Sequence, residues 1–322
     1  MTQSPPPYKV LAFYKFADLS DCQVLKPELA LFCCARKIRG TFILAPEGIN
    51  GTVAGTPEGI DELIDYLNGG PFGTRLQGAE AKISWAETMP FLRMKVRLKP
   101  EIVTLRAPEA NPATRVGTYV EPKDWNALIG SDDVTLIDTR NDYEAAIGTF
   151  AGAIDPGTKS FTEFKHYVAE HLDPTKQKKV AMFCTGGIRC EKASSYLLAQ
   201  GFEEVFHLKG GILKYLEVVP EAESRFHGEC FVFDERVAVT HGLEPGQSQL
   251  CRSCRNPMAP EALTDGICAD CHDAGRAAGA EERERQMSIA RGRGDVHLGE
   301  DAAETAARNR AAKLMRRKQA AR

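Results

Sequence analysis

Apolar residues recur along the first hundred positions with two different spacings, and these predict alternating strands and helices. Compact apolar runs predict strands at 8–16, 41–45, 49–55, 81–87 and 94–98. Helical spacing predicts one helix at 24–39, which Gly40 can end, and a second helix at 57–68. Thr56 suits the cap of the second helix, and Pro57 suits its first position.

The order of these elements is β-α-β-β-α-β followed by one more strand. This order predicts an α+β domain of the ferredoxin-like (acylphosphatase-like) type over residues 1–98. Residues 99–117 contain three prolines among polar residues, so we expect a linker there.

Residues 118–222 alternate between short buried-type strands and helices, which predicts an α/β domain. The strands are expected at 134–138, 179–184 and 205–208, and the helices at 162–172 and 191–200, the last one ended by Gly201. Such alternation is typical of a parallel sheet with helices on both faces. Residues 223–275 are expected to form a small, irregular Cys-rich segment, and residues 276–322 an Ala-, Arg- and Glu-rich tail.

Composition narrows the class of protein. The chain has 322 residues, 43% of them hydrophobic and 26% charged, which excludes a wholly disordered chain. Apolar runs such as 29–35 fall far short of the roughly 20 residues that a membrane helix needs. The start, MTQSPPPYKV, shows no secretory signal, so we expect a cytoplasmic protein with no membrane contact. The formal net charge of −3 offers no general attraction for nucleic acid, so any polyanion needs a local basic patch.

Four of the ten cysteines form two CxxC pairs, Cys251/Cys254 and Cys268/Cys271. Thirteen residues separate the pairs, a spacing that favours a closed tetrahedral zinc site, with His272 or Cys230 as substitutes for one ligand. The alternative is four reduced cysteines in a mobile segment. A zinc knuckle here would either support RNA binding or staple a small segment.

The strongest chemical signal is the loop that follows the predicted strand 179–184. Cys184 ends that strand, and a helix follows the run Thr185, Gly186, Gly187, Ile188, Arg189 and Cys190. Inward backbone N–H groups, a helix N-terminus and the Arg189 cation all favour a thiolate, so we expect Cys184 to have a depressed pKa and to act as a nucleophile. The alternative is a buried, inert cysteine in a glycine turn.

Residues 118–222 resemble the rhodanese superfamily through this loop, LIDTRNDYEAAIGTFAGAID and VFHLKGG. The resemblance implies that Cys184 is the catalytic cysteine, able to carry a persulfide. It also implies that Asp138 and Arg140 brace the loop. The Cys-x4-Arg spacing is one residue shorter than in related phosphatases, which argues against phosphatase activity.

A closer resemblance covers most of residues 8–275. The motifs APEGINGTVAG, KPEIVTL, CTGGIRCEKAS and GECFVFDERV occur in the same order as in the tRNA uridine(34) hydroxylase family. That resemblance implies oxygen-dependent 5-hydroxylation of the wobble uridine, with molecular oxygen as co-substrate and the tRNA anticodon loop as partner.

Several roles follow as hypotheses. Cys184 would add to C6 of uracil as a thiolate, or react as a persulfide or oxidised sulfur. Arg189 and the loop amides would hold the thiolate or the anionic oxygens of an intermediate. Cys190 would resolve an oxidised Cys184, or would simply start a helix in the core. Glu47 and Asn50 lie between two strands, where they would read a base edge or only shape a turn.

Other functions stay open from the sequence. The first rival is a sulfurtransferase that uses a Cys184 persulfide, and the second is a non-enzymatic RNA-binding adaptor. A two-His-one-carboxylate iron site at His227, Glu229 and His241 is not favoured, because chance matches such as His171 with Asp173 also occur. No flavin, haem or NAD motif is seen, and the electron donor is not indicated. Basic residues of the tail would contact tRNA phosphates or form a solvated helix end; they are Arg308, Arg310, Lys313, Arg316, Arg317 and Lys318.

Overall fold

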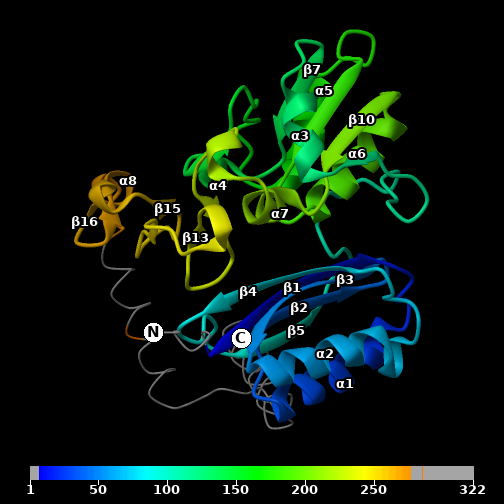
Figure 1. Ribbon diagram of the computed structural model, residues 1–322, viewed down its shortest axis with the longest axis vertical. Coiled ribbons are helices and arrows are strands. Elements are labelled where there is room, and N and C mark those ends of the chain that lie inside the picture. The colour runs from blue at the N-terminus through cyan, green and yellow to red at the C-terminus, as the bar shows by residue number, and fades with distance from the viewer. Residues whose placement is uncertain (1–6, 277–284, 286–322) are drawn as a thin grey trace, which may run out of the picture. The chain divides into compact units, whose positions relative to one another are not determined.

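The computed structural model describes residues 7–276 and 285 (Figure 1). Its described part divides into two compact units, the first ending at Pro100 and the second beginning at Glu101. No helix in this part of the chain is long and apolar enough to cross a membrane. The six basic residues that we singled out in the tail lie outside the described residues.

The first unit is a single five-stranded sheet with two helices, in the predicted order. The elements are β1 (Tyr8–Phe16), α1 (Cys22–Ala35), β2 (Arg39–Ala45), β3 (Gly48–Gly55), α2 (Pro57–Asn68), a 3-10 turn η1 (Gly70–Phe72), β4 (Glu80–Ala86) and β5 (Met94–Leu98). The strand order is β4-β1-β3-β2-β5, with β5 parallel to β2 and all other neighbours antiparallel. The ferredoxin-like prediction is therefore confirmed, with β5 as the extra strand.

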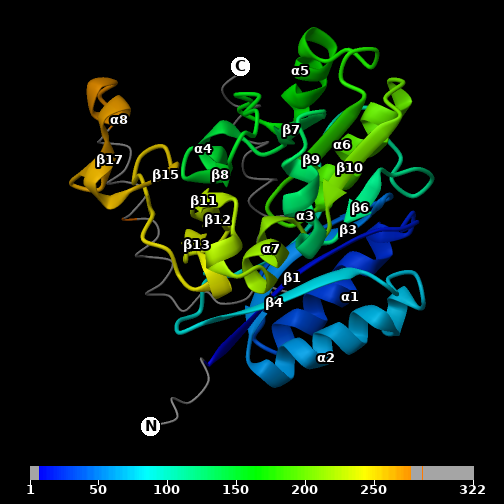
Figure 2. The ribbon, with the colours of Figure 1, turned by 45° about the horizontal axis from the view of Figure 1, so that its top comes forward.

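Both helices pack on one face of this sheet, as Figure 2 shows. The shared core contains Leu29 of α1 and Leu63 of α2, together with alternate strand residues such as Phe13, Phe42 and Val53. Because strand side chains point to opposite faces in turn, the residues between these point away from the helices. The N-terminus of α2 is capped as predicted, since the Thr56 hydroxyl accepts a hydrogen bond from the N–H of Gly59 at 3.2 Å.

The end of the first helix was placed wrongly by the sequence pattern. Helix α1 ends at Ala35, and Gly40 lies inside β2 rather than at a helix end. Lys37 turns the chain with a φ of 56°, and Gly40 has a φ of 136°. A Cβ atom at Gly40 would lie 2.2 Å from the carbonyl oxygen of Thr52 on β3. Glycine is needed there for a close approach of two strands.

The second unit begins with an α/β layer structure. Its elements are β6 (Thr118–Val120), α3 (Pro122–Ile129), β7 (Val134–Asp138), α4 (Asp142–Ala145), β8 (Gly148–Phe150), η2 (Phe161–Glu163), α5 (Phe164–His171), β9 (Lys179–Phe183), α6 (Ile188–Ala199), β10 (Glu204–Leu208), α7 (Gly211–Val218) and η3 (Glu221–Glu223). Strands β6-β10-β9-β7 form one parallel sheet, labelled in Figure 2.

Helices cover both faces of this parallel sheet, as predicted. Val180 and Met182 of β9 share an apolar cluster with residues of α5 and α6. Ala181 and Phe183 of β9 share a second cluster with residues of α3 and α7. Residues 99–117, where we expect a linker, contain no helix or strand, although Leu105 is fully buried against the α5 and α6 side.

The segment after α7 is more regular than the predicted irregular chain. It contains β11 (Phe226–Gly228), which pairs with β8, and three short antiparallel pairs. These pairs are β12 (Cys230–Phe231) with β13 (Ala238–Val239), β14 (Gln249–Leu250) with β15 (Pro257–Met258), and β16 (Leu263–Thr264) with β17 (Ile267–Cys268). The turns η4 (His241–Leu243) and η5 (Pro260–Ala262) and the helix α8 (Ala269–Asp273) complete it.

Candidate functional site

The cysteine loop lies where the parallel sheet ends and a helix begins. Strand β9 ends at Phe183 and α6 starts at Ile188, so the loop between them stands at the carboxyl edge of the sheet. Gly187 is the N-cap of α6 with a φ of 104°, a conformation that favours glycine. Its N–H donates a hydrogen bond of 3.1 Å to the sulfur of Cys184. The helix N-terminus therefore points its positive end at the thiol.

A second helix fixes the same loop from the other side. The N–H of Ile212 donates to the carbonyl of Cys184 at 2.9 Å, and the N–H of Leu213 donates to the carbonyl of Thr185 at 3.1 Å. A Cβ atom at Gly211 would lie 2.5 Å from the Cys184 oxygen. Only glycine lets the start of α7 approach this closely. With the carbonyls bound by α7, the loop keeps its N–H groups turned toward the sulfur.

Arg189 is held by a buried carboxylate. Its two terminal nitrogens donate to the two oxygens of Glu144 at 2.6 and 2.7 Å, and a weaker contact of 3.4 Å reaches the Thr185 hydroxyl. The Glu144 side chain is fully buried. Glu144 also accepts from the backbone N–H of Asn141, which anchors α4 beneath the loop. The guanidinium acts on Cys184 as a fixed charge, because its hydrogen-bond donors are directed at Glu144.

Asp138 and Arg140 form a second, fully buried ion pair at the end of β7. Arg140 donates to both oxygens of Asp138, with the shortest contact at 2.6 Å. It also donates to the carbonyls of Glu144 and Gly148. This pair ties the segment that carries Glu144 to the sheet, and so braces the loop indirectly.

The electrostatics of the two loop cysteines are opposite. Burial raises the pKa of the Cys184 thiol, but a hydrogen bond from Cys190, the charge of Arg189 and the N–H groups of Cys190 and Gly187 outweigh it and hold that pKa well below its usual range. Burial and the neighbouring Cys184 sulfur raise the pKa of Cys190 well above its usual range. At neutral pH the pair is therefore a thiolate next to a thiol.

The structure brings most of the predicted loop residues into one site. Cys184, Arg189 and Cys190 are buried side by side, and Gly186 and Ile188 are half-buried in the same loop. Glu47 and Asn50 lie in the first unit. Glu47 is in the turn between β2 and β3, as expected, whereas Asn50, which we also expected between the two strands, lies within β3 opposite Tyr14 of β1.

Three residues of the site, Glu144, Gly211 and Thr139, were not singled out by sequence reasoning, although all of them lie in the rhodanese-like motifs. Glu144 belongs to LIDTRNDYEAAIG, and Gly211 belongs to VFHLKGG. Thr139 also belongs to LIDTRNDYEAAIG, and its hydroxyl lies 3.4 Å from the sulfur of Cys190. Their place in these motifs could have pointed to Glu144 and Gly211. Their partners, Arg189 and the Cys184 carbonyl, could be identified only from the structure.

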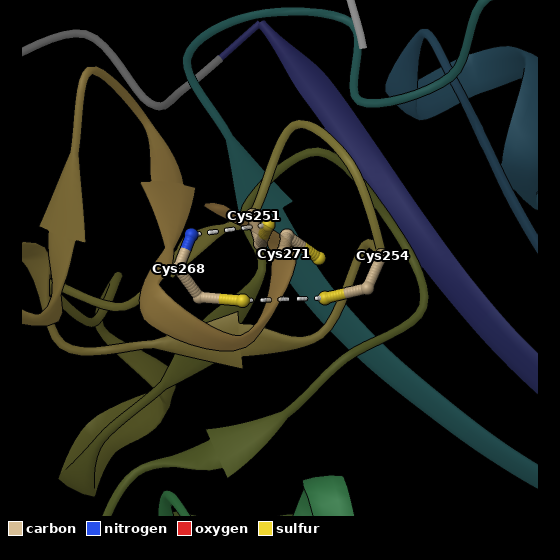
Figure 3. Close-up of side chains that lie close together, drawn as sticks. All are labelled: Cys251, Cys254, Cys268 and Cys271. Carbon is tan, nitrogen blue, oxygen red and sulfur yellow. Dashed lines mark hydrogen bonds between the residues drawn. The ribbon is translucent and has the colours of Figure 1, made fainter. Parts of the chain in front are cut away.

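A second cluster gathers the four cysteines of the CxxC pairs (Figure 3). Their sulfur atoms all lie within 4.8 Å of one another, and those of Cys254 and Cys268 are 3.9 Å apart. A tetrahedral zinc ion with bonds of about 2.3 Å separates its sulfur ligands by roughly 3.8 Å. Cys251 also accepts a hydrogen bond from the N–H of Cys268 at 3.4 Å. Four converging thiols of this spacing can hold a metal ion.

The carboxylate of the disfavoured iron triad has another role in the structure. Both oxygens of Glu229 accept backbone hydrogen bonds, from Gln247 at 2.6 Å and from Ser248 at 2.9 Å. Glu229 thereby fixes the loop that precedes β14.

Comparison with known proteins follows the same division of the chain. The family model described as UPF0176 acylphosphatase like domain matches residues 8–102, and the Rhodanese-like domain model matches residues 121–217. A protein of Mesorhizobium japonicum, named tRNA uridine(34) hydroxylase, is 53% identical over 311 residues, covering 93% of this chain and 100% of the relative. Proteins with the same name from Picosynechococcus sp. and Brucella anthropi are 58% and 52% identical, covering 80% and 91% of this chain and 85% and 98% of the relatives.

Proposed function

The chain belongs to the tRNA uridine(34) hydroxylase family, and from that premise we propose that it adds a hydroxyl group to C5 of the wobble uridine of tRNA. We propose molecular oxygen as the co-substrate and Cys184 as the catalytic nucleophile. One observation carries this assignment: the sulfur of Cys184 accepts a hydrogen bond from a backbone N–H at the start of α6 and lies beside the fixed guanidinium of Arg189.

The proposed chemistry begins with addition of the Cys184 thiolate to C6 of uracil. This addition places electron density at C5, which then attacks an electrophilic oxygen. Loss of the C5 proton and departure of the thiolate restore the ring. One oxygen atom of O2 enters the C5–H bond and the other becomes water, which consumes two electrons and two protons. We assign those electrons to a reductant such as a thiol.

The residues around the sulfur then have separable roles. The N–H of Gly187 and the charge of Arg189 stabilise the leaving thiolate when it departs from C6. Cys190 stays protonated, so it is a proton donor next to the thiolate and can resolve a Cys184 sulfur that has become oxidised. Glu144 is a positioning residue, because it contacts Arg189 rather than the reacting sulfur.

Nucleoside mass spectrometry of tRNA incubated with the protein tests the proposal. We expect 5-hydroxyuridine from the wild-type protein in oxygen with a thiol reductant, labelled when ¹⁸O2 is supplied, and none without oxygen. Cys184→Ser should abolish the product and retain tRNA binding. Cys34→Ser, a change in the half-buried cysteine of α1, is the matched control and should retain the product. Product formation by Cys184→Ser would overturn the assignment.

A sulfurtransferase is the second candidate, and the same loop favours it. The Cys184 thiolate would take the outer sulfur of thiosulfate and release sulfite, and cyanide would then accept that sulfur as thiocyanate. Thiocyanate formation by a protein that leaves tRNA unmodified would establish this candidate in place of hydroxylation. An RNA-binding adaptor would differ from both, because it would not need Cys184.

For the four-cysteine cluster we propose a structural zinc ion, held by Cys251, Cys254, Cys268 and Cys271. The supporting observation is the spacing of the sulfur atoms, which matches a tetrahedral set without a position left for substrate. We expect about one zinc per chain in protein purified without chelator. A content far below one would contradict the proposal.

A further inference from the structure

In the first unit, the face of the sheet that points away from α1 and α2 carries a group of cationic side chains. Alternate residues of β2 and β5 point away from α1 and α2, and among them are Arg39, Lys95 and Arg97. Arg93 directly precedes β5. On β4, Lys82 pairs in register with Ala12 of β1 and so points the same way. We call these five residues the basic sheet face.

Among the described residues, most of these cations have no anionic partner. Arg39, Arg93, Lys95 and Arg97 form no ion pair within the described part of the chain, whereas Lys82 lies 3.6 Å from Glu80. The Nε atom of Arg39 is buried and has no hydrogen-bond partner there. Burial and then the charges of Arg93 and Arg97 lower the pKa of Lys95, which shows that the cations repel one another.

Several cations on the helical side of the same unit have a carboxylate partner, although Lys26 of α1 has none among the described residues. Lys9 pairs with Asp61 of α2, and Arg36 pairs with Glu62 of the same helix. What distinguishes the opposite face is that Arg93, Lys95 and Arg97, none of them ion-paired among the described residues, follow one another at every second position, so that their charges stand in one row. Self-repulsion of this kind reduces stability, so it indicates a ligand that supplies negative charge.

We propose that the basic sheet face binds the phosphate backbone of tRNA. The proposal rests on the proposed function and names the surface that holds its substrate. Lys95 and Arg97 are two positions apart on one strand, so they stand about 6.6 Å apart in a row, which suits a polyanionic chain better than a single small anion. The net charge of −3 makes such a local patch necessary for RNA binding.

The face should hold phosphates rather than read bases. Tyr14 of β1 lies on the same side of the sheet, and the Lys82 ammonium stands over its ring, 5.5 Å from the centroid. That ring is also buried, so it does not offer a stacking surface for a base. Asn50 lies beside Tyr14 on β3 and is the group whose amide suits a base edge. Binding through the cations is accordingly expected to be independent of sequence and sensitive to salt.

Filter binding of full-length protein to tRNA at several salt concentrations tests the proposal. The double change Lys95→Glu with Arg97→Glu should weaken binding at least about tenfold near 0.1 M salt. The milder double change to glutamine should lower the slope of log K against log salt by roughly two. Both residues lie on the edge strand β5, and Arg97 is exposed, so the fold should be retained, which circular dichroism checks.

The control variant carries Lys26→Glu and Lys123→Glu, which change the total charge by the same amount. These lysines lie on α1 and α3 and form no ion pair among the described residues. Their change should alter the affinity less than about twofold. An equal loss in the control, an unchanged affinity and slope in the Lys95 and Arg97 variants, or binding of wild-type protein to acidic vesicles but not to tRNA would overturn the proposal.

Failure of this proposal can be told apart from failure of the proposed function. If wild-type protein forms no 5-hydroxyuridine but its tRNA affinity still depends on Lys95 and Arg97, the surface stands and the hydroxylation fails. If the Lys95 and Arg97 variants form 5-hydroxyuridine with unchanged KM for tRNA, the surface is wrong and the hydroxylation stands.

Discussion

Replacing Glu144 with glutamine removes one member of the buried ion pair with Arg189. The guanidinium then stays buried without the carboxylate to which it donates, and breaking a buried pair in this way costs about 3–5 kcal/mol of unfolding free energy. Arg189→Gln should cost a similar amount, because it leaves the fully buried Glu144 carboxylate unpaired. The double variant removes both charges and should cost less than the sum, with a coupling of about 2–3 kcal/mol.

Urea denaturation in a Trp85→Phe background measures these free energies. The chain has two tryptophans, and this background leaves Trp125, which is fully buried in the second unit, as the reporter of that unit. Two results would refute the role that we give to the pair. One is a loss of unfolding free energy in the double variant that equals the sum of the two single losses, and the other is a loss below about 1 kcal/mol in each single variant.

The pH dependence of the unfolding free energy gives a second check of the Glu144–Arg189 pair. Burial raises the pKa of Glu144, but the charges and hydrogen bonds of Arg189, with the charge of Arg140, lower it below the ordinary value of 4.5. A pKa depressed by folding adds stability above the unfolded value and loses it as the pH falls through the folded value. The difference in unfolding free energy between wild type and Glu144→Gln should therefore be constant from pH 7 to pH 5 and shrink only below about pH 4.

Four further changes have defined outcomes. The thiolate absorbance near 240 nm, taken as wild type minus Cys184→Ser, should persist from pH 9 down to below pH 7, and a midpoint at the ordinary cysteine pKa would contradict the loop electrostatics. Gly211→Ala should displace the loop, because the new Cβ would meet the Cys184 carbonyl at 2.5 Å; we expect a slower formation of 5-hydroxyuridine at unchanged tRNA affinity. Cys254→Ser should lower bound zinc well below one per chain, measured by metal analysis. Thr56→Ala should lower the unfolding free energy of the first unit by about 1 kcal/mol, because a cap hydrogen bond is lost, and an unchanged denaturation midpoint would count against it.

Local chemistry explains what the sequence could predict of the fold. Thr56 and Pro57 mark the start of α2, and the apolar runs mark the main strands, because capping and periodicity depend on neighbouring residues. Gly40 was misread for the same reason. Glycine suits a helix end and a close strand contact equally, and the carbonyl of Thr52 that decides between them is distant along the chain. The strands of two residues after β11 are too short to show alternation.

The candidate site likewise has one part that the sequence could predict and one part that it could not. The run from Cys184 to Cys190 could be recognised because the thiol, the glycines and the arginine are contiguous. The partner of Arg189 could not be read in this way, since Glu144 lies 45 positions earlier and the pair forms only when α4 packs beneath the loop. The contact of Gly211 with the Cys184 carbonyl likewise depends on how α7 returns to the sheet.

The hold of α7 on the loop carbonyls has a consequence for the enzyme at rest. Since Ile212 and Leu213 already bind these oxygens, the peptide groups are set before any RNA arrives, and the sulfur is anionic while the site is empty. Its ionisation needs no contact with the substrate. In an unoccupied molecule the thiolate can therefore be oxidised by any small peroxide that reaches the buried sulfur, and a saturating supply of tRNA is expected to protect it from inactivation.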